Sequence, residues 1–390
     1  MLVNNGKKNM SKNLYYIYID TKILGAVKQL LNYFESDVFN YDACIAVYVK
    51  YYKENSEIIS QIFDDNNIPY RFIRRYSDIS FEDRKVVFYL FNAQSNCRMV
   101  AFRNVSHVFI THGESNKKSS VKPITRIYDH VVTSGQVGID RYLKAGIFSK
   151  YDIEENKVIR LGNTFVGQNN YHHDKNSRTL LYAPTWEGGV ADENFSSITQ
   201  DIHKTLLKVI KDKNIKKLII QTHPNLGHRD NRYNVTFNKA LINLIKQGVN
   251  VYMVKKTVSM RDRVQAFRKG FKYVSSSKPV NVCHAITDIS AMEVQLLVKN
   301  IPTLVLANKH RYKELVIPHK IDSHYSNTMI YLGSKDNKSI RFDSPKTILS
   351  YIESYEEDSL KQLSFKQRVE WLCRFVNERK VSQAKLRESI

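Results

Sequence analysis

The N-terminal half of the chain alternates short apolar runs with segments whose apolar residues recur at helical spacing. Residues 13–20 form a run rich in tyrosine and isoleucine, and residues 23–34 space their apolar side chains as an amphipathic helix does. Three further runs are typical of strands buried on both faces, namely residues 43–50, 85–91 and 107–111. This alternation predicts a parallel α/β sheet covered by helices.

A polar stretch, residues 162–179, precedes a second half in which the alternation restarts. Its strand-like runs are residues 179–184, 216–224, 249–254, 271–276, 284–288 and 301–307, and its helix-like segments are residues 201–212, 261–270 and 290–298. A length of 390 residues is also more than one domain usually holds. We therefore predict two similar α/β domains, residues 1–165 and 166–358.

The last segment, residues 359–390, carries eight Lys/Arg and three Glu. Phe365, Val369, Leu372 and Val376 recur at intervals of 4, 3 and 4, which predicts an amphipathic helix. Two interpretations stay open at this point. The helix either packs across the two domains, or it lies with its basic face on a membrane.

The charge of the chain is strongly positive, because 60 Lys/Arg stand against 38 Asp/Glu and give a formal net charge of +22. Residues 255–278 are the densest basic run, with eight Lys/Arg and one acidic residue, Asp262. Such a field attracts phosphorylated substrates, nucleic acid or an anionic membrane alike. A solvated helix face is the simplest interpretation of the run, and a surface for an anionic acceptor or membrane is the functional one.

The four cysteines, Cys44, Cys97, Cys283 and Cys373, are too widely spaced for a disulfide framework or a thiolate metal site. No Asp-x-Asp triplet occurs, so we predict no obligatory metal or other cofactor. No apolar run is long enough to span a bilayer, and the first residues lack a signal-peptide core. The expected location is the cytoplasm, with peripheral contact to the inner face of the cell membrane.

Four polar clusters each follow a strand-like run, where ligands bind in open α/β sheets. The first cluster combines a histidine, a glycine and two lysines, and the second contains a tryptophan followed by an acid and two glycines. The third is Thr-His-Pro, and the fourth places hydroxyl and carboxyl groups before a predicted helix, where free N–H groups favour anions. Their members are His112, Gly113, Lys117 and Lys118; Thr185, Trp186 and Glu187; Thr222 and His223; and Thr287, Asp288 and Ser290.

Each cluster taken alone also has an ordinary structural interpretation. A loop histidine such as His112 is more often structural than catalytic, and Trp186 alone would be expected to pack in the domain cleft. His223 is as well suited to a buried structural donor as to a phosphate contact. Ser290 or Asp288 alone would usually be a simple helix N-cap.

Taken in order, the clusters resemble a known family. Five stretches of the chain are similar to motifs of the CDP-glycerol glycerophosphotransferases, the teichoic acid primases and polymerases. They are HG with a following lysine pair, RLGN at 160–163, LLYAPTW at 180–186, LIIQTHPN at 218–225 and AITDISA at 285–291. The resemblance covers residues 108–306. It implies a GT-B architecture, in which two Rossmann-like domains face a cleft, with the acceptor on the N-terminal side and the nucleotide-linked donor on the C-terminal side.

The resemblance also implies roles for individual residues. His112 would be the base that deprotonates the acceptor hydroxyl, and His223 would hold or polarise the donor's phosphates. The other implied donor contacts are Thr185, Trp186, Thr222, Thr287, Asp288 and Ser290, and the implied acceptor or phosphate contacts are Gly113, Lys117, Lys118, Gly162 and Asn163. Three positions depart from the family pattern: Glu187 replaces an arginine, Ile289 a tyrosine and Ala291 a serine.

The implied activity is transfer of glycerol phosphate, or a related polyol phosphate, from a CDP-linked donor to a hydroxyl group, with release of CMP. The acceptor would be a lipid-linked glycan or polymer of teichoic acid or capsule synthesis at an anionic membrane. Two alternatives remain at this point. One is a GT-B glycosyltransferase with a nucleotide-sugar donor, since a fold does not fix chemistry. The other is a nucleic-acid-binding protein, although no zinc-finger, RNP or basic-zipper motif occurs and we predict no specific nucleic acid.

Overall fold

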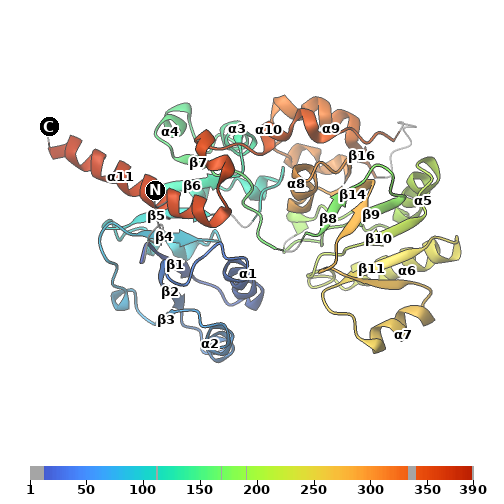
Figure 1. The fold of residues 1–390 in the computed structure, drawn as a ribbon, viewed down its shortest axis with the longest axis horizontal. Helices are drawn as coiled ribbons and strands as arrows, with labels where there is room; N and C mark the ends of the chain where they lie inside the picture. The colour runs from blue at the N-terminus through green and yellow to red at the C-terminus, as the bar shows by residue number, and fades with distance from the viewer. Residues whose placement is uncertain (1–12, 111–112, 168, 190, 333–339, 389–390) are drawn as a thin grey trace, which may run out of the picture.

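The computed structural model of the chain describes residues 13–110, 113–167, 169–189, 191–332 and 340–388. Within these ranges two seven-stranded sheets, one in each half of the chain, lie next to each other, and a long C-terminal helix returns to the first half (Figure 1). All neighbouring strands of the two large sheets pair in parallel. The predicted α/β class is therefore confirmed.

The first sheet has the strand order β3-β2-β1-β4-β5-β6-β7. Its strands are β1 Tyr15–Ile19, β2 Cys44–Lys50, β3 Tyr70–Ile73, β4 Val86–Tyr89, β5 Ser106–Ile110, β6 His130–Thr133 and β7 Val158–Arg160, and its helices are α1 Leu24–Glu35, α2 Ser56–Asp65, α3 Gln136–Lys144 and α4 Lys150–Glu154. The central strand β1 is buried on both faces. Tyr15, Ile17 and Ile19 join the core formed with α1 and α2, whereas Tyr16 and Tyr18 join the core on the α3 side. This double burial explains why the run shows no polar alternation.

The second sheet has the order β12-β11-β10-β9-β14-β15-β16. Its strands are β9 Thr179–Ala183, β10 Lys217–Ile220, β11 Val251–Lys255, β12 Lys272–Ser275, β14 His284–Asp288, β15 Thr303–Ala307 and β16 Met329–Tyr331; its helices are α5 Ile202–Asp212, α6 Arg232–Lys246, α7 Met260–Arg268, α8 Ala291–Val298, α9 Asp322–Thr328 and α10 Leu349–Ile352. Two short strands, β8 Tyr171–His173 and β13 Val280–Val282, form a separate parallel pair.

In both sheets the strand order reverses beside the first strand, between β1 and β4 and between β9 and β14. Such a reversal opens a crevice at the carboxyl ends of the strands, where open α/β sheets bind ligands. Two Rossmann-like domains with their strand ends turned toward a shared cleft are the GT-B arrangement. The predicted architecture is thus confirmed.

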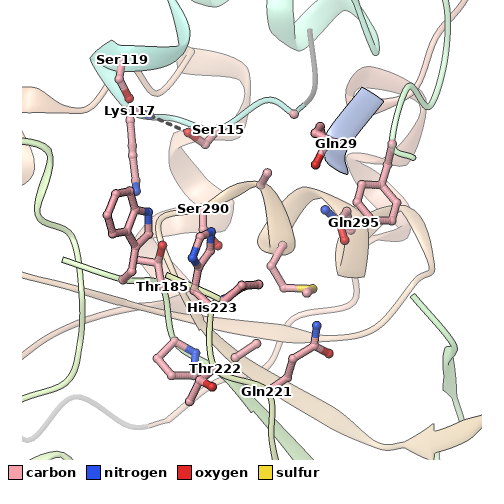
Figure 2. A pocket seen from close by; sticks show the side chains of 18 of the residues that line it. Gln29, Ser115, Lys117, Ser119, Thr185, Gln221, Thr222, His223, Ser290 and Gln295 are labelled. Atoms are coloured by element: carbon pink, nitrogen blue, oxygen red, sulfur yellow. Dashed lines mark hydrogen bonds between the residues drawn. The ribbon is translucent and has the colours of Figure 1, made fainter. Parts of the chain in front are cut away.

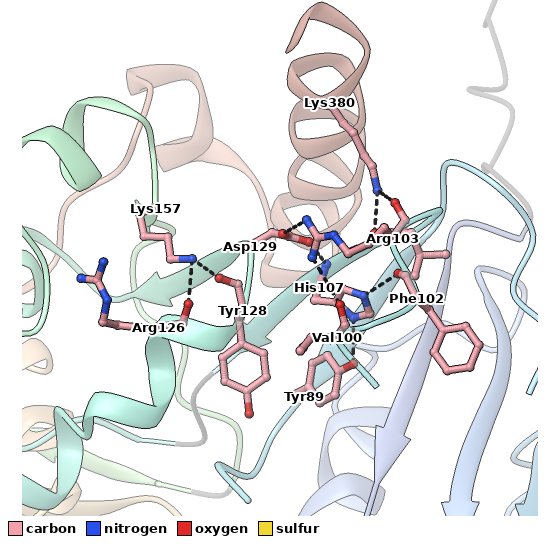
Figure 3. A network of polar contacts seen from close by, with 11 residues as sticks. Tyr89, Val100, Phe102, Arg103, His107, Arg126, Tyr128, Asp129, Lys157 and Lys380 are labelled. Carbon is pink, nitrogen blue, oxygen red and sulfur yellow. Dashed lines mark hydrogen bonds and ion pairs between the residues drawn. The ribbon is translucent and has the colours of Figure 1, made fainter. Parts of the chain in front are cut away.

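The C-terminal helix α11, Phe365–Glu388, packs on the first domain (Figures 1 and 3). Val369, Leu372 and Val376 are buried in the core that also contains α1 and α2. Lys380 Nζ donates to the main-chain oxygens of Arg103 at 2.6 Å and Val105 at 2.7 Å. The apolar face of this helix thus packs on the first domain. Packing across both domains and contact of its basic face with a membrane stay predictions.

Within the ranges that the structure describes, no helix is both long enough and apolar enough to span a bilayer.

Gly162, a predicted phosphate contact, instead docks the C-terminal segment. Its φ is +73°, and an added Cβ would lie 2.1 Å from the Tyr355 ring and 2.8 Å from the Arg368 guanidinium. Its N–H donates to the Ser354 carbonyl at 3.1 Å. Next to it, the Asn163 carbonyl accepts from Arg368 at 2.8 Å. The turn is filled by the chain itself, so the predicted phosphate contact at Gly162 is wrong.

Substituting Gly162 with alanine is expected to lower the free energy of unfolding by about 2–4 kcal/mol, because left-handed strain adds to a clash with Tyr355. Gly146→Ala is the matched control: its φ is +65°, but nothing lies within 4 Å of an added Cβ. That variant should lose only the strain, about 1–2 kcal/mol. Urea unfolding of both variants measures the difference, and equal losses would contradict the docking role of Gly162.

Candidate functional site

The predicted motifs of the second domain lie at the ends of three neighbouring strands of its sheet. Strands β10, β9 and β14 are adjacent, and the reversal of strand order lies between the last two. Thr185 and Trp186 follow β9, His223 follows β10, and Ser290 follows β14. Because the strands are parallel, their carboxyl ends meet at one edge of the sheet.

The first domain faces this edge with the loop that follows β5. Gly113, Ser115 and Lys117 from this loop line the same cavity as the motifs of the second domain, and its volume is about 370 Å³. Figure 2 shows Lys117 reaching from the loop toward Thr185, with Ser290 and His223 pointing into the same space. The sequence motifs of both domains thus form one site in the cleft.

The loop lies directly against the N-terminus of helix α8. A Cβ at Gly113 would stand 2.9 Å from Cβ of Ala291, the first residue of that helix. The φ of Gly113, +156°, is also unfavourable for other residues. Glycine is therefore needed here to bring the first domain onto the helix end.

Ser290 stands at the N-cap of α8 and lines the cavity. Its side chain does not cap the helix, and its Oγ is buried without a hydrogen-bond partner among the described residues. The first N–H groups of a helix are free of intrahelical partners, and the helix dipole favours negative charge there. An unpaired hydroxyl beside a helix N-terminus suits the oxygens of a phosphate.

His223 is a neutral hydrogen-bond donor in this site. Burial, together with the charge of Lys117, lowers its pKa to about 4. Its Nδ1 accepts the N–H of Asn225 at 3.1 Å, so the proton of the neutral ring resides on Nε2. The ring stacks on Trp186 with 5.7 Å between centroids and 13° between planes. The stack fixes the orientation of both rings at the cavity wall.

Lys117 is the cation of the site. It lines the cavity, and its Nζ lies 5.0 Å from the ring centroid of Phe195. Burial lowers the pKa of Lys117, whereas the carboxyl groups of Asp288 and Glu193 act in the opposite direction. A lysine held away from bulk water is well placed to bind an anionic ligand, since each charge interaction there is weakly screened.

Thr287 and Asp288 do not line the cavity, contrary to the predicted phosphate contacts. Both are fully buried. Asp288 Oδ2 accepts the N–H groups of Thr185 at 2.7 Å and Ser197 at 3.0 Å, and Thr287 Oγ1 donates to the Asp288 carbonyl. No surface remains for a donor phosphate, so we correct their role: Asp288 positions the loop that carries Thr185.

Glu187, where the family pattern has an arginine, is likewise structural. It is fully buried, and its carboxylate accepts the N–H groups of Gly227 at 3.0 Å, Arg229 at 2.9 Å and Asp230 at 3.0 Å. Burial opposes its charge, but these donors outweigh burial and hold its pKa below the ordinary value. The carboxylate is thus committed to the loop after β10 and not to the cavity.

The other predicted residues fall in different places. Thr222 lines the cavity, and its contact with a donor stays a prediction. Lys118 is exposed and lines none of the cavities described here. Asn163 Oδ1 accepts the N–H of Phe165 at 3.0 Å, within the linker between the domains. His112, the predicted base, lies outside the described residues.

A buried polar network across the domains was not predicted. Asn116, from the β5 loop, donates to the Tyr325 hydroxyl at 2.6 Å, and this hydroxyl in turn donates to Glu293 on α8. Arg141 on α3 donates to Asn116 at 2.9 Å and pairs with Glu114 at 3.0 Å. The network ties the lysine-bearing loop to α8. Its members are scattered along the sequence, so no spacing pattern could have identified it.

Several cavity residues were also not predicted from the sequence. Gln29 on α1, Ser115, Ser119, Gln221 and Gln295 line the site together with the predicted residues. Of these, Gln221 directly precedes the predicted residue Thr222, so the sequence offered a signal for it.

The described ranges contain no cluster of three or more His, Cys, Asp or Glu arranged to hold a metal ion.

A second cavity of about 440 Å³ adjoins the first. It shares Gly113, Lys117, Ser119 and Trp186 with the first cavity. Residues of the first domain, among them Phe91 and Asn92 at the end of β4, form its remaining wall. The shared lysine therefore lies between a space lined by the second domain and a space lined mainly by the first.

The sequence matches no protein-family model and no curated protein. Among solved structures, the chain is similar to UDP-GlcNAc 2-epimerase from Neisseria meningitidis bound to UDP-GlcNAc, with 10% identity, a TM-score of 0.43, and coverage of 95% of this chain and 100% of that one. It is also similar to the outer core galactosyltransferase WaaB, with 13% identity, a TM-score of 0.42, and coverage of 90% and 97%. MurG from Acinetobacter baumannii aligns with 9% identity and a TM-score of 0.40 over 92% of each chain.

Proposed function

We propose that the chain is a transferase that binds a nucleotide diphosphate-linked donor in the cleft and moves the linked group to an acceptor hydroxyl. The observation that carries the proposal is the convergence of Lys117, His223 and Ser290 at the reversal of strand order in the second sheet. These groups and the α8 N-terminus offer one positive charge and several donors within one cavity. A diphosphate is the ligand that fits this set.

In the proposed reaction the linked group is a sugar. The acceptor oxygen forms a bond to the anomeric carbon, the bond from that carbon to the diphosphate oxygen breaks, and the electron pair leaves with the nucleoside diphosphate. Lys117, the Ser290 hydroxyl and the His223 Nε2–H stabilise the negative charge that grows on the leaving oxygens. His112 is the proposed acceptor of the hydroxyl proton, and the second cavity is the proposed acceptor site.

The number of cationic side chains that line the cavity supports sugar transfer over phosphoryl transfer. Displacement at phosphorus usually depends on several cations around the transferred group. Among the described residues that line the 370 Å³ cavity, Lys117 is the one Lys or Arg. The family's additional arginine is replaced by Glu187, whose carboxylate is already bound to three main-chain N–H groups.

The second candidate is the polyol phosphate transferase that the motifs resemble. Its specific support is the order of the motifs, since LLYAPTW, QTHP and AITDIS lie at the carboxyl ends of the three strands that form the site. In this reaction the acceptor oxygen attacks the polyol-side phosphorus of a CDP-linked polyol phosphate, and CMP leaves. A lipid-linked glycan as acceptor, and no obligatory metal, stay part of both proposals.

The released nucleotide distinguishes the two candidates. The protein is incubated with UDP-, GDP- and CDP-linked sugars and with CDP-glycerol and CDP-ribitol, with lipid-linked acceptors and excess EDTA, and the nucleotides are separated by chromatography. Release of a nucleoside diphosphate supports the first candidate, and release of CMP supports the second. Release of neither from any donor, with or without added magnesium, would contradict transferase function.

A further inference from the structure

Helix α7, Met260–Arg268, presents an apolar face to solvent. Met260 is 74% exposed, Val264 47% and Phe267 82%, whereas Ala266 is the one residue of this helix that is buried. The helix lies beside the edge strand β12, at the outer end of the second domain (Figure 1). The site described above does not use it.

The three apolar residues share one side of the helix. At about 100° per residue, positions 260, 264 and 267 fall within a sector of roughly 60°, and Ala266 points away from that sector toward the domain. Arg263 borders the sector on one side, and Arg261 and Arg268 border it on the other. An apolar stripe between arginines is the pattern of a helix that lies in a membrane interface.

The surroundings of α7 are basic and exposed. All eight Lys/Arg of residues 255–278 are exposed, and Lys255 forms an ion pair with Asp262, the only acidic residue of the run, at 2.6 Å. The Asp262 carboxylate also accepts from Ser259, the N-cap residue, in a capping box. Of the other seven exposed Lys/Arg of the run, four are on or next to α7, namely Arg261, Arg263, Arg268 and Lys269.

We propose that α7 docks the second domain on an anionic lipid surface. Met260, Val264 and Phe267 enter the boundary between headgroups and acyl chains, and Arg261, Arg263, Arg268 and Lys269 bind the headgroup phosphates. Charge complementarity selects this occupant, because an apolar stripe framed on both sides by cations matches a layer with apolar interior and anionic surface. The proposal is independent of the reaction in the cleft.

Vesicle sedimentation of the full chain tests the proposal. We expect binding to equimolar phosphatidylglycerol and phosphatidylcholine vesicles, weak binding to phosphatidylcholine alone, and a loss of affinity with added salt. Met260→Ser with Phe267→Ser removes the stripe, and Arg261→Glu with Arg268→Glu reverses two charges. Each pair should weaken binding at least about tenfold, without changing the circular dichroism spectrum.

Two matched controls keep the test specific. Val235 and Ile242 on α6 are 48% and 50% exposed, so their serine variants remove exposed apolar side chains outside the stripe. Lys208 and Lys211 are exposed on α5, so their glutamate variants change the net charge by the same amount. Both control pairs should bind vesicles within about twofold of the original chain, since interfacial binding depends on the position of the buried apolar face and of the nearby charges.

Three outcomes would overturn the proposal. The first is unchanged vesicle binding in both α7 pairs, and the second is equal loss in the control pairs. The third is absence of vesicle binding together with a dimer, seen by light scattering, that the serine pair dissociates. That result would assign the stripe to a second copy of the chain.

Discussion

Replacing Lys117 with methionine is expected to lower kcat/KM about 10²–10³-fold, as loss of one preorganised charge on a leaving group does in other enzymes. The methionine keeps most of the apolar length of the side chain beside Phe195, so the cavity stays filled and the fold intact. The loss should appear in kcat as well as in KM, because the charge on the diphosphate is larger in the transition state than in the bound donor. Steady-state assays with the donor that the nucleotide screen identifies give both constants.

Lys118 supplies the matched control for this experiment. It is the next residue in the chain, has the same formal charge and is exposed outside the cavity. Lys118→Met should therefore keep its activity within about twofold, because an exposed charge is screened by solvent. Equal losses in the two variants would remove Lys117 from the site and indicate a general effect of the basic loop.

Asp288 is expected to contribute a loss of unfolding free energy as pH rises from about 4 to 7. Burial raises its pKa to about 7, above the ordinary 3.8, in spite of the N–H groups of Thr185 and Ser197. At this carboxyl the folded chain therefore binds more protons than the unfolded chain between these two values, and the contribution of Asp288 to stability is lost as pH rises through that window. Asp288 contributes about 2–4 kcal/mol to this loss.

Asp288→Asn should remove the loss that Asp288 contributes, because asparagine has the shape of the protonated acid and does not titrate. Glu293 titrates in the same direction, since burial raises its pKa to about 7, so Glu293→Gln should remove a separate contribution to the pH slope. The histidines His107, His223 and His284 act in the opposite direction below about pH 6.5, because burial lowers their pKa values to about 4. Urea unfolding of the original chain and both variants at several pH values measures the slopes. An Asp288→Asn variant whose unfolding free energy keeps the pH slope of the original chain would contradict the account.

The strands and loops that form the site could be predicted from the sequence, because central parallel strands are buried on both faces. Such strands appear as uninterrupted apolar runs, and the polar residues that follow them must lie at the ligand-binding edge. Thr185, Trp186, His223 and Ser290 were found in this way, and all four line one cavity. The same argument identified the loop after β5 that carries Lys117.

Side-chain direction at the strand ends was not predictable. Both Thr287 and Asp288 end the strand β14, yet both are enclosed, because the segment after Thr185 folds over the carboxylate. Gly162 was misassigned because Tyr355 fills its turn from a distant part of the sequence. Strands β6 and β7 and the helix α3 were also missed, since they are short and their segments are more polar than those of the central strands.

The central claim, that the cleft binds a nucleotide diphosphate, can be measured with the chain's own fluorescence. The protein has two tryptophans, and Trp371 on α11 packs against Phe375 away from the cavity. In a Trp371→Phe variant, emission reports only Trp186, which lines the cavity and stacks on His223. We expect a saturable change in this emission on titration with UDP, GDP or CDP, and much weaker affinity once Lys117→Met is added. No saturable change with any of the three, together with no heat of binding by calorimetry, would contradict the account.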